Sequence, residues 1–269
     1  MKYAFMSFST PELTFDKMLE VARRYGYDGI EPRIDSDHAH GLAVETPAAQ
    51  RKALRDQAAD AGVAIACVAT SLRYADPAQA DEMIAGTHER IDLAGDLGAP
   101  ALRVFGGMIP EGVTREQAMD RLVESLSAVA DHAAERNVAL CLETHDDWCD
   151  PRHVAEVLRR VDRPSIAANW DIMHPVRTGK ATIDESFEAL RPWIRHLHIH
   201  DGVADENGRP LLRPIGEGQV DHRQAMKRLL ELGYDGFLSG EWIRWESYEK
   251  HLPRELETLR RLEAEQTGS

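Results

Sequence analysis

Short apolar runs alternate along the chain with longer segments in which apolar residues recur every three or four positions. The short runs predict eight β-strands: Tyr3–Ser7, Gly29–Ile34, Ala64–Thr70, Ala101–Phe105, Ala139–Thr144, Ile166–Asp171, Ile194–His200 and Gly236–Glu241. The longer segments predict amphipathic helices, as in the series Met119, Leu122, Val123 and Leu126. Regular alternation of strand and helix is typical of βαβ units on a parallel sheet.

Eight such units in 269 residues match the size of a closed (β/α)₈ barrel. Glycines at Gly26, Gly62, Gly98 and Gly233 stand where predicted helices end, before the next strand. The alternative, an open doubly wound sheet, is disfavoured because no Gly-x-Gly-x-x-Gly follows the first strand and no Walker-type phosphate loop occurs. No linker is visible, so we expect an α/β protein with one domain, a (β/α)₈ TIM barrel over residues 1–269.

Two segments after predicted strands, Pro32–Thr46 and Gly202–Asp221, carry no periodic pattern. Loops after barrel strands commonly surround the active site. We expect both segments to be loops without secondary structure of their own, and candidate lids.

Composition narrows the class of protein. The formal net charge of −14 disfavours partners such as nucleic acid or an acidic membrane surface. Three cysteines do not suggest a disulfide framework, and the first residues do not resemble a signal peptide. The longest apolar run, Val63 to Ala69, is far shorter than the about 20 residues that a membrane span needs. These features predict a cytoplasmic protein without membrane association.

Residue types that bind hard metal ions recur at the ends of the last four predicted strands. They are Glu143, Asp171, His198 and Glu241. His196 and His200 share a face with His198, and we expect only one of the three histidines at the height of the acids. An inward-facing carboxylate is costly unless it is paired or bound to a cation. Three oxygen ligands and one nitrogen ligand suit Mn²⁺, which we favour, as well as Mg²⁺ or catalytic Zn²⁺.

The order Glu, Asp-x-x-His, His-x-His, Glu resembles the xylose-isomerase-like TIM barrels, a family that includes sugar (phosphate) isomerases, 3-epimerases and inosose dehydratases. The strings Arg-Val-Phe-Gly-Gly at 103–107 and Ile-Gly-Glu-Gly at 215–218 are also similar to this family. The resemblance implies one divalent ion held by Glu143, Asp171, His198 and Glu241. It also implies a substrate contact at His174. Many members carry Lys where this chain has His200, so the role of that Lys does not transfer.

The implied chemistry acts on an α-hydroxyketone or α-hydroxyaldehyde. A bound cation stabilises an enediolate, and Glu143 and Glu241 act as the acid and base on either side of it. The result is epimerisation or isomerisation of a sugar or sugar phosphate. His145 is a second candidate for contact with the substrate. Arg103 either binds a substrate anion or forms a salt bridge with a core acid such as Glu31.

Other functions remain open on the sequence alone. Elimination of water by an inosose-type or keto-sugar lyase would use the same enediolate. A metal-dependent apurinic endonuclease for DNA repair is disfavoured, because the stretch Pro210–Pro214 lacks the Asp-x-His pair of that branch. A barrel that binds carbohydrate without catalysis is a further alternative. A homo-oligomer is possible, and no particular face of the chain predicts one.

Overall fold

The computed structural model describes residues 1–206 and 209–267. Within these residues the main sheet has nine strands in the order β3-β2-β1-β11-β8-β7-β6-β5-β4. All of its strand pairs are parallel. The strands are β1 (Lys2–Met6), β2 (Gly29–Glu31), β3 (Ala64–Ile65), β4 (Val68–Arg73), β5 (Ala101–Phe105), β6 (Ala139–Glu143), β7 (Ile166–Asp171), β8 (Ile194–Ile199) and β11 (Phe237–Gly240).

The predicted third strand is divided into β3 and β4, which changes the count but not the architecture. β3 pairs with β2, whereas β4 pairs with β5. Arg33, which follows β2, forms an isolated parallel bridge with Ala69 of the edge strand β4, and Ile34 N–H donates to the Ala69 carbonyl. These contacts nearly close the sheet on itself, and the predicted TIM barrel is confirmed.

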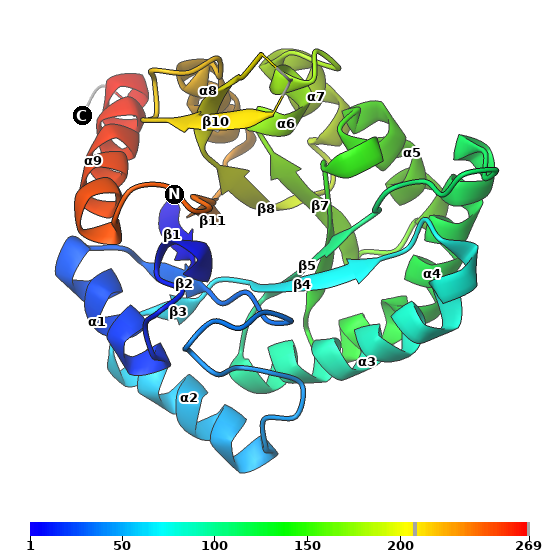
Figure 1. Cartoon of the computed structure of the whole chain (residues 1–269), viewed down its shortest axis with the longest axis horizontal. Coiled ribbons are helices and arrows are strands. Elements are labelled where there is room, and N and C mark those ends of the chain that lie inside the picture. Colours follow the sequence, from blue (N-terminus) through cyan, green and yellow to red (C-terminus); the bar gives the residue numbers. More distant parts are fainter. Residues whose placement is uncertain (207–208, 268–269) are drawn as a thin grey trace.

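Helices surround the barrel on the outside (Figure 1). They are α1 (Phe15–Tyr25), α2 (Ala48–Asp60), α3 (Ala80–Leu97), α4 (Arg115–Glu135), α5 (Pro151–Val161), α6 (Met173–Arg177), α7 (Ile183–Leu190), α8 (His222–Leu232) and α9 (Tyr248–Thr267). Capping boxes begin α4 at Thr114 and α7 at Thr182. At the end of α1, Gly26 has φ 86°, a left-handed conformation that glycine adopts without steric cost.

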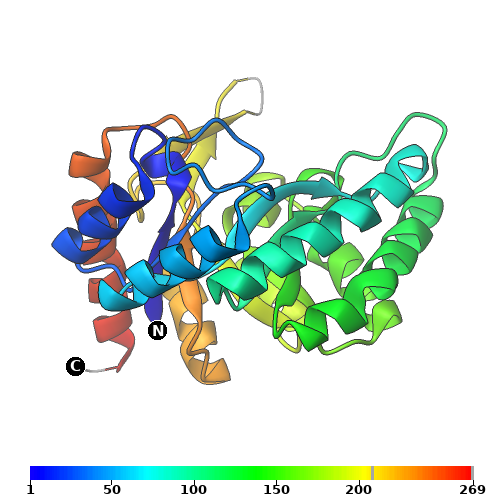
Figure 2. The ribbon, with the colours of Figure 1, turned by 90° about the horizontal axis from the view of Figure 1, so that it is seen from below.

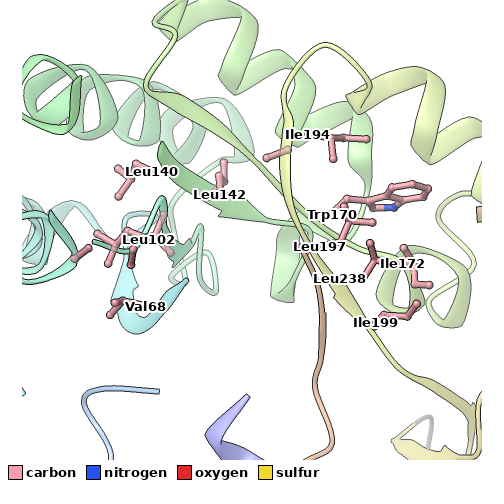
Figure 3. Packing of buried hydrophobic residues seen from close by; sticks show 14 of the residues in the cluster. Val68, Leu102, Leu140, Leu142, Trp170, Ile172, Ile194, Leu197, Ile199 and Leu238 are labelled. Atoms are coloured by element: carbon pink, nitrogen blue, oxygen red, sulfur yellow. The ribbon is translucent and has the colours of Figure 1, made fainter. Parts of the chain in front are cut away.

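Successive strand residues alternate between the helix layer and the barrel interior. Leu140, Leu142, Trp170 and Leu197 belong to the large apolar cluster between strands and helices (Figure 3). The intervening positions point inward. A small cluster of Cys67, Ala101, Cys141 and Ala167 fills part of the interior. Polar residues, the candidate ligands among them, occupy inward positions nearer the carboxyl ends of the strands.

The loops after the strands gather on the side of the barrel opposite both chain termini (Figure 2). The expectation that Gly202–Asp221 lacks secondary structure is wrong. β9 (Asp201–Ala204) and β10 (Pro210–Arg213) form an antiparallel hairpin there. The Asp201 carboxylate anchors the return of this segment by accepting the backbone N–H groups of Gly216, Gly218 and Val220.

Across residues 1–206 and 209–267, no helix combines the length and the apolar character needed to cross a membrane.

Candidate active site

Four inward-facing side chains meet at the carboxyl ends of neighbouring strands. Glu143 and Asp171 are the last residues of β6 and β7, and His198 lies opposite Asp171 in the ladder of β7 and β8. Glu241 directly follows β11, the neighbour of β8 on its other side. All four are buried, and each offers one ligand atom within 4.8 Å of the others. The residues that the sequence predicted as ligands are therefore close enough to share one ion.

His198 lies between the two glutamates. Its Nδ1 atom is 2.7 Å from Glu143 Oε1 and 3.7 Å from Glu241 Oε2. Burial opposes the charged imidazolium, but the surrounding carboxylates, Glu143 first, raise the pKa of His198 well above its usual value. Burial also opposes the charge on Glu143, whereas His198 and Arg103 together lower the pKa of Glu143 to about 2. Burial raises the pKa of Glu241, and repulsion from Glu143 adds to this effect.

Asp171 is held in one orientation by its backbone surroundings. Its Oδ1 atom accepts the N–H groups of Met173 and His174, at 2.9 and 2.8 Å, at the start of α6. Its Oδ2 atom is 2.8 Å from His200 Nε2. Burial would raise the pKa of Asp171, but the nearby imidazoles, His174 first, lower it. Both oxygens of Asp171 are thus held in place, and a ligand atom of Asp171 still lies within 4.8 Å of those of Glu143, His198 and Glu241.

The donor set fits a divalent cation. Glu143 Oε2 is buried and accepts no hydrogen bond from a described residue, although Arg103 Nε lies 3.3 Å away. Three buried carboxylates face one another, an arrangement that needs compensating positive charge. Two glutamates, one aspartate and one imidazole form an oxygen-rich set of the kind that binds Mn²⁺, Mg²⁺ or a catalytic Zn²⁺. The cluster therefore indicates a divalent metal centre without identifying the metal.

Three further histidines form a row beside these residues. The ring centroids of His145 and His174 are 4.6 Å apart, and those of His174 and His200 are 5.4 Å apart. Burial lowers the pKa of His174 to about 4, so this imidazole is neutral at pH 7. His145 Nδ1 is 2.9 Å from Asp146 Oδ1, and although burial opposes its charge, Asp146 and then Glu143 raise the pKa of His145 to about 9. The two predicted substrate contacts, His145 and His174, therefore lie side by side.

Arg103 forms the core salt bridge considered from the sequence, but with a different acid. Its Nε atom is 3.3 Å from Glu143 Oε2, its Nη1 atom donates to the Thr70 carbonyl at 2.7 Å, and its guanidinium lies over the Phe105 ring. Glu31 is not its partner. The side chain is buried within the barrel, next to a candidate ligand, so any contact with substrate would be made from this fixed position.

Two features of the site were missed from the sequence. His200 belongs to a second group of possible ligands with Asp171, His174 and Glu241, so more than one of the three strand histidines reaches the height of the acids. Glu31 accepts hydrogen bonds from two imidazoles inside the barrel. Glu31 is the third residue of the predicted strand Gly29–Ile34, so the strand-end signal that identified Glu143 did not single it out, whereas the observed strand β2 does end at Glu31.

Comparison with known proteins identifies the family. The profile of the xylose isomerase-like TIM barrel family matches residues 19–262. A 3-dehydroshikimate dehydratase of Bacillus anthracis is 25% identical over 264 residues, which cover 90% of this chain and 91% of that protein. A fructoselysine 3-epimerase of Escherichia coli O157:H7 is 28% identical over 130 residues, covering 46% of this chain and 45% of that protein.

Similarity also extends to solved structures. A xylose isomerase-like TIM barrel protein from Mycobacterium smegmatis, in complex with magnesium, superposes with a TM-score of 0.73 at 20% identity. The superposition covers 98% of this chain and 97% of that chain. At this identity the superposition supports the fold, while the two relatives matched by sequence are named for enzyme activities.

Proposed function

Because the chain belongs to the xylose isomerase-like TIM barrel family, we propose that it is a divalent-metal-dependent isomerase or epimerase of a small sugar or sugar phosphate. The observation that carries this proposal is the convergence of Glu143, Asp171, His198 and Glu241 within 4.8 Å at the carboxyl ends of adjacent strands. In barrels of this kind the active site lies at the end of the barrel where the carboxyl ends of the strands meet.

The four side chains would hold one ion, with Mn²⁺ favoured and Mg²⁺ or Zn²⁺ as alternatives. Such an ion supplies Lewis acidity, which stabilises negative charge on two neighbouring substrate oxygens and acidifies the carbon-bound proton beside them. His198 contributes the single nitrogen ligand. Asp171, whose Oδ1 atom accepts two backbone N–H groups, contributes its Oδ2 atom, which is also 2.8 Å from His200 Nε2.

Glu143 and Glu241 are the proposed acid and base. They come from β6 and from the end of β11, and β7 and β8 lie between these strands in the sheet. The two carboxylates therefore approach a substrate above Asp171 and His198 from two sides. One glutamate removes the carbon-bound proton and the other returns it. Return to the opposite face of the same carbon gives epimerisation, and return to the neighbouring carbon gives isomerisation.

The neighbouring side chains orient the substrate in this proposal. His174 and His145 lie beside the carboxylates and hydrogen-bond substrate hydroxyl groups. Arg103 keeps Glu143 ionised and in place through its contact of 3.3 Å, and is the candidate for contact with an anionic substituent.

Dehydration is the second candidate, and the row of histidines favours it. Loss of a hydroxyl group needs a proton donor in addition to the base that removes the carbon-bound proton. His145, whose pKa is raised to about 9, is protonated at pH 7 and lies at the edge of the site. The dehydratase of Bacillus anthracis also matches nearly the whole chain.

A substrate panel in deuterated water separates the candidates. The protein is loaded with Mn²⁺ and incubated with ketoses, their phosphates and hydroxylated cyclic ketones, and the products are followed by NMR and mass spectrometry. Isomerase or epimerase activity predicts deuterium at one carbon with no loss of water. Dehydratase activity predicts a product lighter by one water. No turnover of any member with bound Mn²⁺ would contradict the proposal.

A further inference from the structure

A fourth buried carboxylate, Glu31, reaches the site from the opposite part of the barrel wall. It is the last residue of β2, a strand separated from β8 by β1 and β11 in the sheet. Its Oε2 atom is 2.8 Å from His196 Nε2, and its Oε1 atom is 3.1 Å from His198 Nε2. Glu31 is fully buried, and both imidazoles are at least 99% buried.

The chemistry of these groups fixes where the hydrogens lie. An ionised carboxylate only accepts hydrogen bonds, so His196 and His198 both donate from Nε2. When an ion is bound, His198 is a neutral imidazole with one N–H, and a hydrogen on Nε2 leaves the lone pair on Nδ1 for the ion. That Nδ1 atom is the one that lies 2.7 Å from Glu143 Oε1 and 3.7 Å from Glu241 Oε2.

We propose that Glu31 is a positioning residue for the metal centre, which fixes His198 as the Nε2–H tautomer with Nδ1 directed at the ion. The inference rests on the metal centre of the proposed function. His196 donates to the second oxygen of Glu31. This bond holds the carboxylate in the orientation in which its first oxygen accepts from His198 Nε2. Partners that orient a metal-bound histidine in this way commonly contribute 10- to 100-fold in metal affinity.

The same three residues could themselves surround an ion, since their ligand atoms also lie within 4.8 Å of one another. Hydrogen bonding explains their geometry better. The distances of 2.8 and 3.1 Å are those of ordinary N–H···O bonds. An ion in this position would also require His198 to bind two cations through its two nitrogens. Glu31 therefore supports the ion indirectly, through His198.

The test measures Mn²⁺ affinity in Glu31→Gln. The amide has a single oxygen, which faces one of the two imidazole N–H groups. Its NH₂ group must then face the other imidazole. We expect the Kd for Mn²⁺, followed by the EPR signal of the free ion, to rise about 10- to 100-fold. If Glu31→Gln does not fold, the measurement is made on Glu31→Asp, which keeps the charge on a shorter side chain. We expect a smaller increase in the Kd for Mn²⁺ in that variant.

Glu255→Gln is the matched control. Glu255 is also fully buried, and it accepts the Ile215 N–H at 2.8 Å and pairs with Arg254, away from the four candidate ligands. Its replacement removes a buried carboxylate of the same type. We expect this variant to bind Mn²⁺ as wild type does, so a loss of affinity confined to the Glu31 variants is not a general effect of destabilising the fold.

A spectroscopic readout tests the tautomer directly. In ¹⁵N-histidine-labelled protein at a Mg²⁺ concentration that just saturates the wild type, His198, assigned by comparison with His198→Asn, should carry its hydrogen on Nε2. At the same concentration Glu31→Gln should show a fraction of molecules with no ion bound and with hydrogen on Nδ1. Unchanged Mn²⁺ affinity and an unchanged tautomer in Glu31→Gln would overturn the role of Glu31. So would binding of two Mn²⁺ per chain in the wild type, with one of them lost in His196→Gln. Failure of the wild-type protein to bind Mn²⁺ would instead overturn the metal centre itself.

Discussion

The two glutamates of the candidate site have identical side chains and different surroundings. Glu143 contacts Arg103 at 3.3 Å and His198 at 2.7 Å, and its pKa is lowered to about 2. Glu241 is farther from His198, at 3.7 Å, and its pKa is raised, by burial first. Environment, rather than residue type, therefore separates the properties of the two proposed proton carriers.

Replacement of Glu241 by Gln tests its proposed role. The amide keeps an oxygen for the metal but cannot carry a proton, so we expect kcat to fall about 10²- to 10⁴-fold. Binding of Mn²⁺ should weaken but persist, because the variant loses a ligand charge, so the kinetics are measured at saturating Mn²⁺. The measurement is steady-state kinetics, with Glu231→Gln on the outer helix α8 as the control. Activity close to wild type in Glu241→Gln would exclude Glu241 as a proton carrier.

His40 gives a prediction about pH and stability. Burial lowers the pKa of His40 to about 4, while its Nδ1 accepts the Leu42 N–H and its Nε2 donates to the Arg33 carbonyl. Its folded-state pKa is below the unfolded value of about 6.5, so the unfolded state binds more protons between these values. The stability from neutral His40 is complete above about pH 6.5 and is lost as the pH falls toward 4.

Urea unfolding at pH 7 and pH 5 measures this effect. From pH 7 to pH 5 the free energy of unfolding should fall more in the wild type than in His40→Gln, because the amide of the variant does not titrate. An equal fall in both proteins would show that the protonation of His40 is not coupled to folding.

At the scale of elements, the strands were predicted from the sequence more accurately than the loops. β5 has the predicted bounds, and β7 does too, because each is a short apolar run between turn signals. The third strand is divided, since an apolar run does not reveal that its hydrogen-bond partner changes from β2 to β5. The hairpin of β9 and β10 was missed because its sequence lacks a regular apolar alternation.

Gly106, in the loop after β5, gives a prediction at this scale. A Cβ atom on Gly106 would lie 2.2 Å from Cδ1 of the buried Trp148, whose indole N–H donates to the Gly107 carbonyl. Gly106→Ala should therefore reduce the free energy of unfolding by about 1–3 kcal/mol or more, through overpacking. The measurement is urea denaturation.

Gly86→Ala in α3 provides the contrast. Its new Cβ atom would first meet the flexible side chain of Arg90, at 3.0 Å, and alanine favours the helix. This variant should be neutral or slightly stabilised. Equal destabilisation of both variants would show that contact with Trp148 is not the cause.

At the scale of the whole molecule, the barrel and the four candidate ligands were predicted because strand order and strand ends are local features. Equal spacing along the chain becomes equal height in a parallel barrel. The partners of these residues were not predictable in this way. Arg103 pairs with Glu143, and Glu31 with the imidazoles of β8, only because the closed barrel brings inward-facing side chains from distant strands together.

Metal removal should lower the stability of the whole chain. An ion that binds only the folded state at 100 times its Kd adds about 2.7 kcal/mol. For a domain of this size we expect a Tm higher by roughly 5–10 °C with saturating Mn²⁺ than with EDTA. Asp171→Asn should reduce this difference, because it removes a ligand charge. A Tm independent of Mn²⁺ in the wild-type protein would contradict a folded-state metal site.

Anomalous X-ray diffraction at the manganese absorption edge, from crystals grown with Mn²⁺, tests the metal centre most directly. The account predicts an anomalous peak within coordination distance of Glu143, Asp171, Glu241 and Nδ1 of His198. No peak at this position, with His198 Nδ1 still hydrogen-bonded to Glu143, would contradict it.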